Sequence, residues 1–172
     1  MYKQIRENFI NAVNKRVDNT ERPIACLLSG GLDSSIVASL VSRFYNKKLE
    51  TYSIGLEGGE DLKYAKIVSE HIGSNHTEII VTEEDFFNQI PNVIEKIESY
   101  DTTTVRASVG NYLIAKYISE NSKAKVIFNG DGSDELMGGY LYMKACPDHL
   151  EFDKETKNLL KNIHYFDVLR SD

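Results

Sequence analysis

One glycine-rich turn, at residues 29–35, constrains this chain more than any other feature. It follows a continuous apolar run of strand length, residues 24–28, and precedes a stripe of apolar residues at helical spacing, residues 36–44. A strand that turns through two glycines into a helix directs backbone N–H groups and the positive helix end towards one point. The turn therefore predicts an anion site that fits a phosphate group. Its sequence is Ser29-Gly30-Gly31-Leu32-Asp33-Ser34-Ser35.

The rest of the chain alternates between strand and helix patterns. Such alternation implies parallel strands joined by right-handed helical crossovers. The predicted fold class is α/β, an open, doubly wound parallel sheet with helices on both faces, in one domain of 172 residues. A polar, helical segment follows residue 139 and ends in an apolar stripe at residues 159–169. Apolar periodicity predicts helices at 2–17, 36–44, 62–72, 84–100 and 107–122, and short apolar runs predict strands at 24–28, 49–56, 76–81 and 124–129.

A second glycine-rich loop, residues 129–140, follows the last predicted strand. Ligands of such sheets bind at the carboxyl ends of strands, where both loops lie. Asp131, Asp134 and Glu135 place three carboxylates within five residues, which is costly unless they are solvated, share a proton or hold a cation. Asp33 in the first loop would likewise repel a phosphate unless a metal ion joined them. The two loops predict a divalent metal site, and simple helix capping at either loop stays open as the alternative.

Composition argues against several other functions. A net charge of −6 and an isoelectric point near 5.3 argue against a nucleic-acid-binding surface. No stretch approaches the roughly 18 apolar residues of a membrane span. Two cysteines, Cys26 and Cys146, are too few for a disulfide framework, and the four histidines lack metal-ligand spacing, so we assign them no role. We expect a cytoplasmic protein with neither nucleic-acid nor membrane partners.

The first loop, with Leu28 before it, resembles the pyrophosphate-binding loop of N-type ATP pyrophosphatases, which split ATP into AMP and pyrophosphate during adenylation. The second loop and residues 98–108 narrow the resemblance to asparagine synthetases, over nearly the whole chain. The resemblance implies an adenine nucleotide alpha hydrolase-like fold and an amide-forming ligase that uses ATP and Mg²⁺. Such an enzyme adenylates the side-chain carboxylate of aspartate, and ammonia then displaces AMP to give asparagine. A related ligase for another carboxylate, or a truncated non-catalytic ATP-binding module, stays open.

The same resemblance implies roles for individual residues. Asp33 and Asp134 would hold Mg²⁺ against the pyrophosphate, and Asp131, where many members have Glu, would serve in forming the aspartyl-adenylate. Thr103 and Arg106 would hold an anionic intermediate, whereas the residues alone favour Arg106 as a helix-start arginine paired with a surface glutamate. The nucleotide would be bound by Leu28, Ser29, Gly30, Gly31, Asp33, Ser34, Ser35, Ile54, Asn129 and Gly130.

Against that family, we expect residues 1–172 to form a partial ATP-pyrophosphatase domain, with the glutaminase domain and the C-terminal helical part absent. Residue 2 is Tyr2, where the family's glutaminase domain has its cysteine nucleophile, and the family's late lysine is missing. A glutaminase domain or subunit acting in trans would then supply ammonia. Faces that the missing helices cover, around residues 140–142 and 166–169, would be exposed apolar patches, which predicts a homo-oligomer or a marginally stable monomer.

Overall fold

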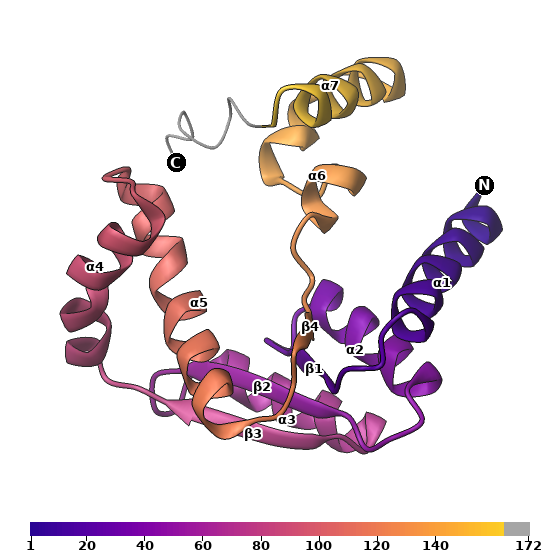
Figure 1. The fold of residues 1–172 in the computed structure, drawn as a ribbon. Coiled ribbons are helices and arrows are strands. Elements are labelled where there is room, and N and C mark those ends of the chain that lie inside the picture. Colours follow the sequence, from indigo (N-terminus) through magenta and orange to yellow (C-terminus); the bar gives the residue numbers. More distant parts are fainter. Residues whose placement is uncertain (164–172) are drawn as a thin grey trace.

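A computed structural model of the protein describes residues 1–163. Its centre is a four-stranded parallel sheet in the order β3-β2-β1-β4 (Figure 1). The first strand pairs on both sides, with Leu27 opposite Tyr52 and Cys26 opposite Phe128. The order of the strands reverses beside β1, because β2 and β3 are added on one side of it and β4 on the other. The strands are β1 (Ile24–Leu27), β2 (Glu50–Gly55), β3 (Asn75–Ile80) and β4 (Val126–Phe128).

Helices cover both faces of the sheet, which confirms the predicted fold class. Side chains alternate along β1, so Ile24 and Cys26 join the core under three helices, while Ala25 joins the core under a fourth. The first face carries α1 (Tyr2–Asp18), α2 (Leu32–Phe44) and α3 (Glu60–Ile72), and the second carries α5 (Thr102–Asn121). A further helix, α4 (Glu83–Ile97), packs on α5 through a cluster around Val93.

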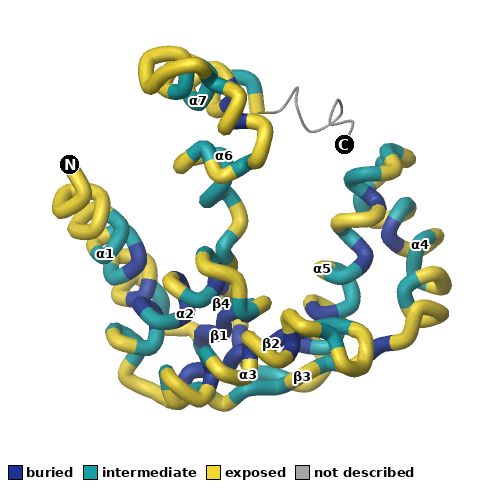
Figure 2. Tube along the Cα trace, turned by 180° about the vertical axis from the view of Figure 1, so that it is seen from behind, coloured by how far each residue is buried: buried dark blue, intermediate teal, exposed yellow. Residues whose placement is uncertain are grey.

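Burial is concentrated where β1 and β2 lie between the helical layers (Figure 2). The elements after β4 stand apart from the sheet in both views. There the ring of Phe152 packs on Gly138, where an added Cβ would lie 2.3 Å from the ring. These elements are α6 (Ser133–Met137), a 3-10 helix (Leu141–Ala145) and α7 (His149–Lys161).

Every predicted helix and strand before residue 130 is present, with shifted ends. The largest shift is in α5, which begins at Thr102 rather than near residue 107. Asp101 causes it, because its carboxylate accepts hydrogen bonds from the Thr104 amide (2.8 Å) and the Thr104 hydroxyl (2.7 Å). The threonine run therefore forms the first turn of α5, and the Thr104 hydroxyl is already engaged in capping.

The apolar residues around 140–142 are exposed only in part. Leu141 is 78% exposed and Tyr142 51%, whereas Tyr140 is half-buried and stacks on Tyr142 with ring centroids 5.6 Å apart. The other predicted patch, residues 166–169, lies outside the described residues. An oligomer stays a prediction, and light scattering of concentrated protein tests it. Within the described part of the chain, no helix combines the length and the apolar character that crossing a membrane requires.

Candidate active site

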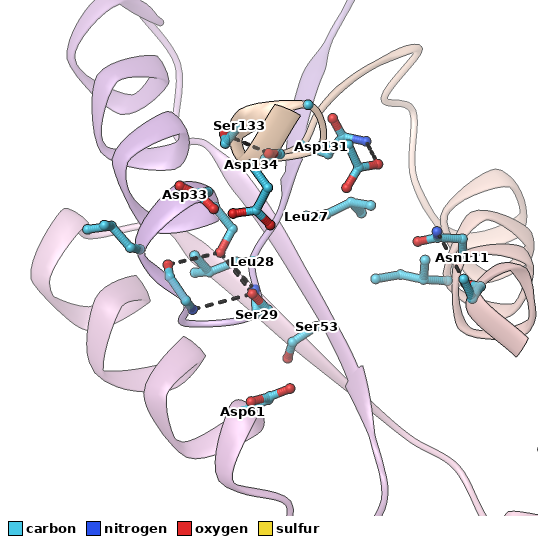
Figure 3. Close-up of a pocket in the computed structure, with 18 of the residues that line it drawn as sticks. Leu27, Leu28, Ser29, Asp33, Ser53, Asp61, Asn111, Asp131, Ser133 and Asp134 are labelled. Carbon is cyan, nitrogen blue, oxygen red and sulfur yellow. Dashed lines mark hydrogen bonds between the residues drawn. The ribbon is translucent and has the colours of Figure 1, made fainter. Parts of the chain in front are cut away.

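Two loops meet at the carboxyl edge of the sheet, where the strand order reverses. The first loop, residues 29–35, runs from β1 into the first turn of α2, and the second loop, residues 129–140, runs from β4 through α6. Because β1 and β4 are neighbours in the sheet, their loops emerge side by side. Such a switch point is where open α/β sheets bind ligands. A cavity of about 640 Å³ lies there, lined by both loops, the end of β2, the start of α3 and one side of α5 (Figure 3).

The cavity brings together most of the predicted site residues from segments about 100 residues apart in the chain. Four of them lie elsewhere: Gly30, Ser35, Thr103 and Arg106 do not line it. The predicted residues that do line it are Leu28, Ser29, Gly31, Asp33, Ser34, Ile54, Asn129, Gly130, Asp131 and Asp134.

The two glycines of the first loop have different roles. Gly30 has φ +81°, and a Cβ there would lie 2.5 Å from both the Ala65 amide nitrogen and the Tyr64 Cβ. It therefore allows the turn to pack against α3. Gly31 has an ordinary φ of −67°, and its added Cβ would meet only the Ser29 hydroxyl at 3.4 Å. Gly31 therefore needs no unusual backbone angle, and its lack of a side chain leaves the loop backbone open to the cavity.

The serines of the first loop also differ in position. Ser34 is buried and braces the turn: its hydroxyl accepts from the Ser29 amide (3.3 Å), donates to the Gly31 carbonyl (3.3 Å) and lies 3.0 Å from the Ser29 hydroxyl. Ser35 points away from the cavity into a groove between α2 and α3. Its hydroxyl oxygen is buried without a hydrogen-bond partner among the described residues. The structure thus separates Ser35 from the other predicted nucleotide-binding residues.

The second loop is held by its own side chains and by its contact with α2. The Ser133 hydroxyl donates to the Gly130 carbonyl (2.8 Å), and the Asn129 amide donates to the Asp131 carboxylate (2.6 Å). Gly130 lies against the first turn of α2, where an added Cβ would be 2.8 Å from the Ser34 amide nitrogen. The loop therefore presents Asp131 in a fixed orientation at the cavity (Figure 3).

Two carboxylates from different loops face the same cavity. Asp33 lies in the first turn of α2 and Asp134 in the first turn of α6, and both line the cavity (Figure 3). The other second-loop carboxylates are engaged, Asp131 by Asn129 and Glu135 by the Tyr140 hydroxyl. No group of three or more His, Cys, Asp or Glu side chains in residues 1–163 could hold a metal unaided. Two carboxylates facing a phosphate-sized space nevertheless suit Mg²⁺, which binds through one or two carboxylates and completes its shell with water and substrate phosphates.

The helical period of α5 decides which of its residues reach the cavity. Ala107, Asn111 and Ile114 line it, at spacings of four and three residues. Thr103 lies one turn earlier on the same stripe, farther from the sheet. Arg106 lies on the adjacent stripe and borders a separate pocket between α4 and α5. The prediction that Arg106 holds an anionic intermediate rested on the family resemblance and on the threonine run before it, and in this structure its side chain borders α4 rather than the cavity.

Several polar residues line the cavity although the sequence analysis gave them no role, among them Ser53, Asp61 and Asn111. Ser53 carried a readable signal, because it is a polar residue in the middle of a run that predicts a buried strand. Asn111 lies on the same face of α5 as Ala107 and Ile114, and their helical spacing predicts that the three share a face but not that this face borders a cavity. Asp61 begins α3, and only the folded chain places it beside the first loop.

Comparison with known proteins decides the family. The family described as Asparagine synthase matches residues 4–168. This chain belongs to the asparagine synthase family. It is 46% identical over 173 residues to human "Asparagine synthetase [glutamine-hydrolyzing]" and 47% identical to its mouse counterpart. Each alignment covers 98% of this chain and 31% of the relative, so the chain spans about a third of the length of these relatives.

Solved structures with little sequence similarity share the fold of this synthase-family chain. An NH3-dependent NAD synthetase from Campylobacter jejuni has a TM-score of 0.56 at 18% identity, covering 81% of this chain and 61% of its own. An NMN synthetase from Francisella tularensis has a TM-score of 0.54 at 16% identity, covering 80% and 58%. At such identities the likeness speaks for the fold alone, and it agrees with the predicted α/β class.

Proposed function

We propose that this chain forms part of the ATP-pyrophosphatase domain of an asparagine synthetase. In the proposed reaction, an oxygen of the aspartate side-chain carboxylate attacks the α-phosphorus of ATP and pyrophosphate leaves. The nitrogen of ammonia then attacks the acyl carbon, AMP leaves, and the nitrogen loses a proton to give asparagine. The observation that carries the proposal is the meeting of the two loops, with Asp33 and Asp134 on one cavity in a member of this family.

The first loop is the proposed phosphate site. The N-terminus of α2 and the loop amides attract negative charge, and Gly31 leaves room for a phosphate oxygen to approach the main chain. We propose that Asp33 and Asp134 hold Mg²⁺ opposite the phosphates. When bound there, Mg²⁺ would neutralise charge on the departing pyrophosphate. Ser34 acts indirectly in this proposal, because its hydroxyl holds the shape of the turn.

The nucleoside and the aspartate would occupy the rest of the cavity. Leu28 and Ile54 supply apolar contact at the ends of β1 and β2, and Gly130 lines the cavity from the loop after β4. Asp131, oriented by Asn129, is the acidic residue we assign to the aspartyl-adenylate step. Thr103 and Arg106 stay in the proposal as residues of the first turns of α5, beyond the cavity lining. A cytoplasmic location and a glutaminase domain or subunit as the ammonia source belong to the same proposal.

The test is pyrophosphate release from ATP by this chain with Mg²⁺, aspartate and ammonium, each omitted in turn. Release that requires Mg²⁺ and aspartate, and that continues over many turnovers only with ammonium and with asparagine and AMP as the other products, supports the proposal. Release that another carboxylic acid supports and aspartate does not would contradict the choice of aspartate. Binding of MgATP without turnover, unchanged when a glutaminase domain and the C-terminal part of a relative are added in trans, would contradict the ligase activity.

A further inference from the structure

A row of buried and half-buried polar side chains runs from the cavity, along β2 and β3, to the amino end of β3. Thr51 and Ser53 point to the same face of β2 and are 0% and 4% exposed. His76 on β3 lies opposite Thr51, and its ring spans both hydroxyls. Its Nδ1 is 2.9 Å from the Thr51 hydroxyl oxygen, and its Nε2 is 3.1 Å from the Ser53 hydroxyl oxygen. Ser53 in turn lines the cavity.

The far end of this row favours one direction for its hydrogen bonds. When the Ser74 hydroxyl donates to the Ser69 carbonyl (3.4 Å), it accepts from Thr51, whose hydroxyl oxygen lies 2.8 Å away. Thr51 has then used its proton and accepts from the N–H at Nδ1 of His76. In this tautomer Nε2 carries no proton and accepts from the Ser53 hydroxyl. The Ser53 hydroxyl then donates its only proton to His76, so towards the cavity it can only accept a hydrogen bond.

The surroundings of His76 keep its ring neutral. Burial lowers the pKa of His76 below its ordinary value, against an opposing effect from Glu78 on the same strand. The other charged groups around the ring are Lys66 and Glu70 on α3 and Lys48 before β2. The ring is therefore neutral at neutral pH, and one of its two nitrogens is available as an acceptor.

We propose that His76 is a positioning residue that fixes the Ser53 hydroxyl as a hydrogen-bond acceptor for the nucleoside part of ATP. The nucleoside group that this arrangement favours is an N–H or O–H donor, either the 6-amino group of adenine or a ribose hydroxyl. A 6-oxopurine nucleotide offers an acceptor in place of the amino group and would be disfavoured if that group is the donor. This inference rests on the proposed function, because it takes the cavity to bind ATP.

The binding test compares the wild type with Ser53→Ala, His76→Leu, His76→Gln and the double variant Ser53→Ala/His76→Leu. Calorimetry measures the affinity of each protein for MgATP, for MgITP and for the Mg²⁺ complexes of 2′-deoxy-ATP and 3′-deoxy-ATP. Ser53→Ala should weaken MgATP about three- to tenfold, the loss of one ordinary hydrogen bond. Ser53→Ala should cause no further loss of affinity for the analogue that lacks the donor, so the analogue that the substitution leaves unaffected identifies the group.

The histidine variants separate positioning from general stability. His76→Leu alone should lower the affinity for MgATP. Added to Ser53→Ala, it should cause no further loss of affinity. His76→Gln, whose amide oxygen can accept from Ser53, should restore part of the affinity. Equal losses for all four nucleotides, or additive losses in the double variant, would overturn the inference. A wild type that binds no MgATP contradicts the proposed function as well, whereas a binding wild type with unaffected variants contradicts this inference alone.

A second measurement needs no nucleotide. Histidine labelled with ¹⁵N reports the tautomer of His76 in the free protein at pH 7.5, with the signal assigned by its absence in His76→Gln. We expect the Nδ1–H tautomer, and Thr51→Val should weaken that preference while leaving the fold intact. Protonation at Nε2 in the wild type would reverse the direction of the row and overturn the inference.

Discussion

The backbone of Gly130 lies so close to Asp33 that a Cβ added to the glycine would be 3.0 Å from the Asp33 Cβ. The contact joins the loop after β4 to the first turn of the helix after β1. It holds the two loops at the distance at which Asp33 and Asp134 line one cavity. A residue without a side chain is therefore required at position 130 for packing, before any contact with a ligand is considered.

The substitution Gly130→Ala should separate the two loops. The added Cβ would lie 2.8 Å from the backbone nitrogen of Ser34, and backbone cannot move aside as a side-chain end can. Overpacking of this kind costs about 1–3 kcal/mol in the free energy of unfolding, which urea titration measures. Gly110→Ala is the matched control, because its Cβ would meet Phe86 at an ordinary 3.7 Å, and it should keep or raise stability. Equal stabilities of the two variants would contradict the contact.

The substitution Gly31→Ala tests whether an anion approaches the first loop. The backbone angles at Gly31 suit alanine, and the added Cβ has room, so thermal stability should stay within about 0.5 kcal/mol of the wild type. Affinity for MgATP, measured by calorimetry, should fall more than about tenfold because the methyl group occupies the phosphate's approach. Gly30→Ala serves as the contrast, since its strained turn and the contact with α3 predict a loss of stability. Full MgATP affinity in folded Gly31→Ala would place the phosphates elsewhere.

Much of this fold is readable from the sequence, because apolar periodicity changes from strand to helix at each boundary. The alternation also places both glycine-rich loops at the carboxyl ends of strands. It does not give the order of the strands, and that order makes the loops after β1 and β4 neighbours. The sequence therefore predicts two halves of a site, while long-range pairing of the strands joins them.

The differences at the site have local causes. Asp101 starts α5 five residues earlier than the apolar stripe indicates, so the threonine run forms its first turn. Arg106 then lies on the helix beside α4 and not in the cavity lining. Ser53 was given no role because the sequence does not show that the end of its strand borders the cavity. Its partner His76 is 23 residues away in sequence, beyond any local pattern.

The cap of α5 should depend on pH. Hydrogen bonds from the Thr104 amide and hydroxyl hold the pKa of Asp101 below its ordinary value. A lowered pKa in the folded state means that the cap is fully formed above the ordinary pKa of aspartate and is lost as the pH falls through the folded-state value. The protection factor of the Thr104 amide, which is its intrinsic exchange rate divided by the rate that NMR records at the same pH, should therefore fall only in acid. Asp101→Asn keeps an acceptor oxygen and should remove the pH dependence, and a wild-type profile in that variant would contradict the assignment.

The two cysteines should differ in reactivity. Burial in the central strand raises the pKa of the Cys26 thiol to about 12, so it stays protonated and shielded at pH 8. Cys146 follows the 3-10 helix and is partly exposed. Iodoacetamide should modify Cys146 in the native protein and reach Cys26 only after unfolding, as peptide mass spectrometry would record. Cys146→Ser is the control that should take up no label while folded, and native labelling of Cys26 would contradict the packing of β1.

The most direct measurement of the central claim is the affinity of the wild type, Asp33→Asn and Asp134→Asn for ATP, measured once with Mg²⁺ and once with EDTA. Glu120→Gln, an exposed change near the far end of α5, is the matched control for losing one negative charge. Each aspartate variant should lose about tenfold or more in affinity with Mg²⁺, in keeping with about 1.5–3 kcal/mol for a contact to a charged group, and little with EDTA. Unchanged Mg²⁺-dependent affinity in both variants would contradict a metal site shared by the two loops.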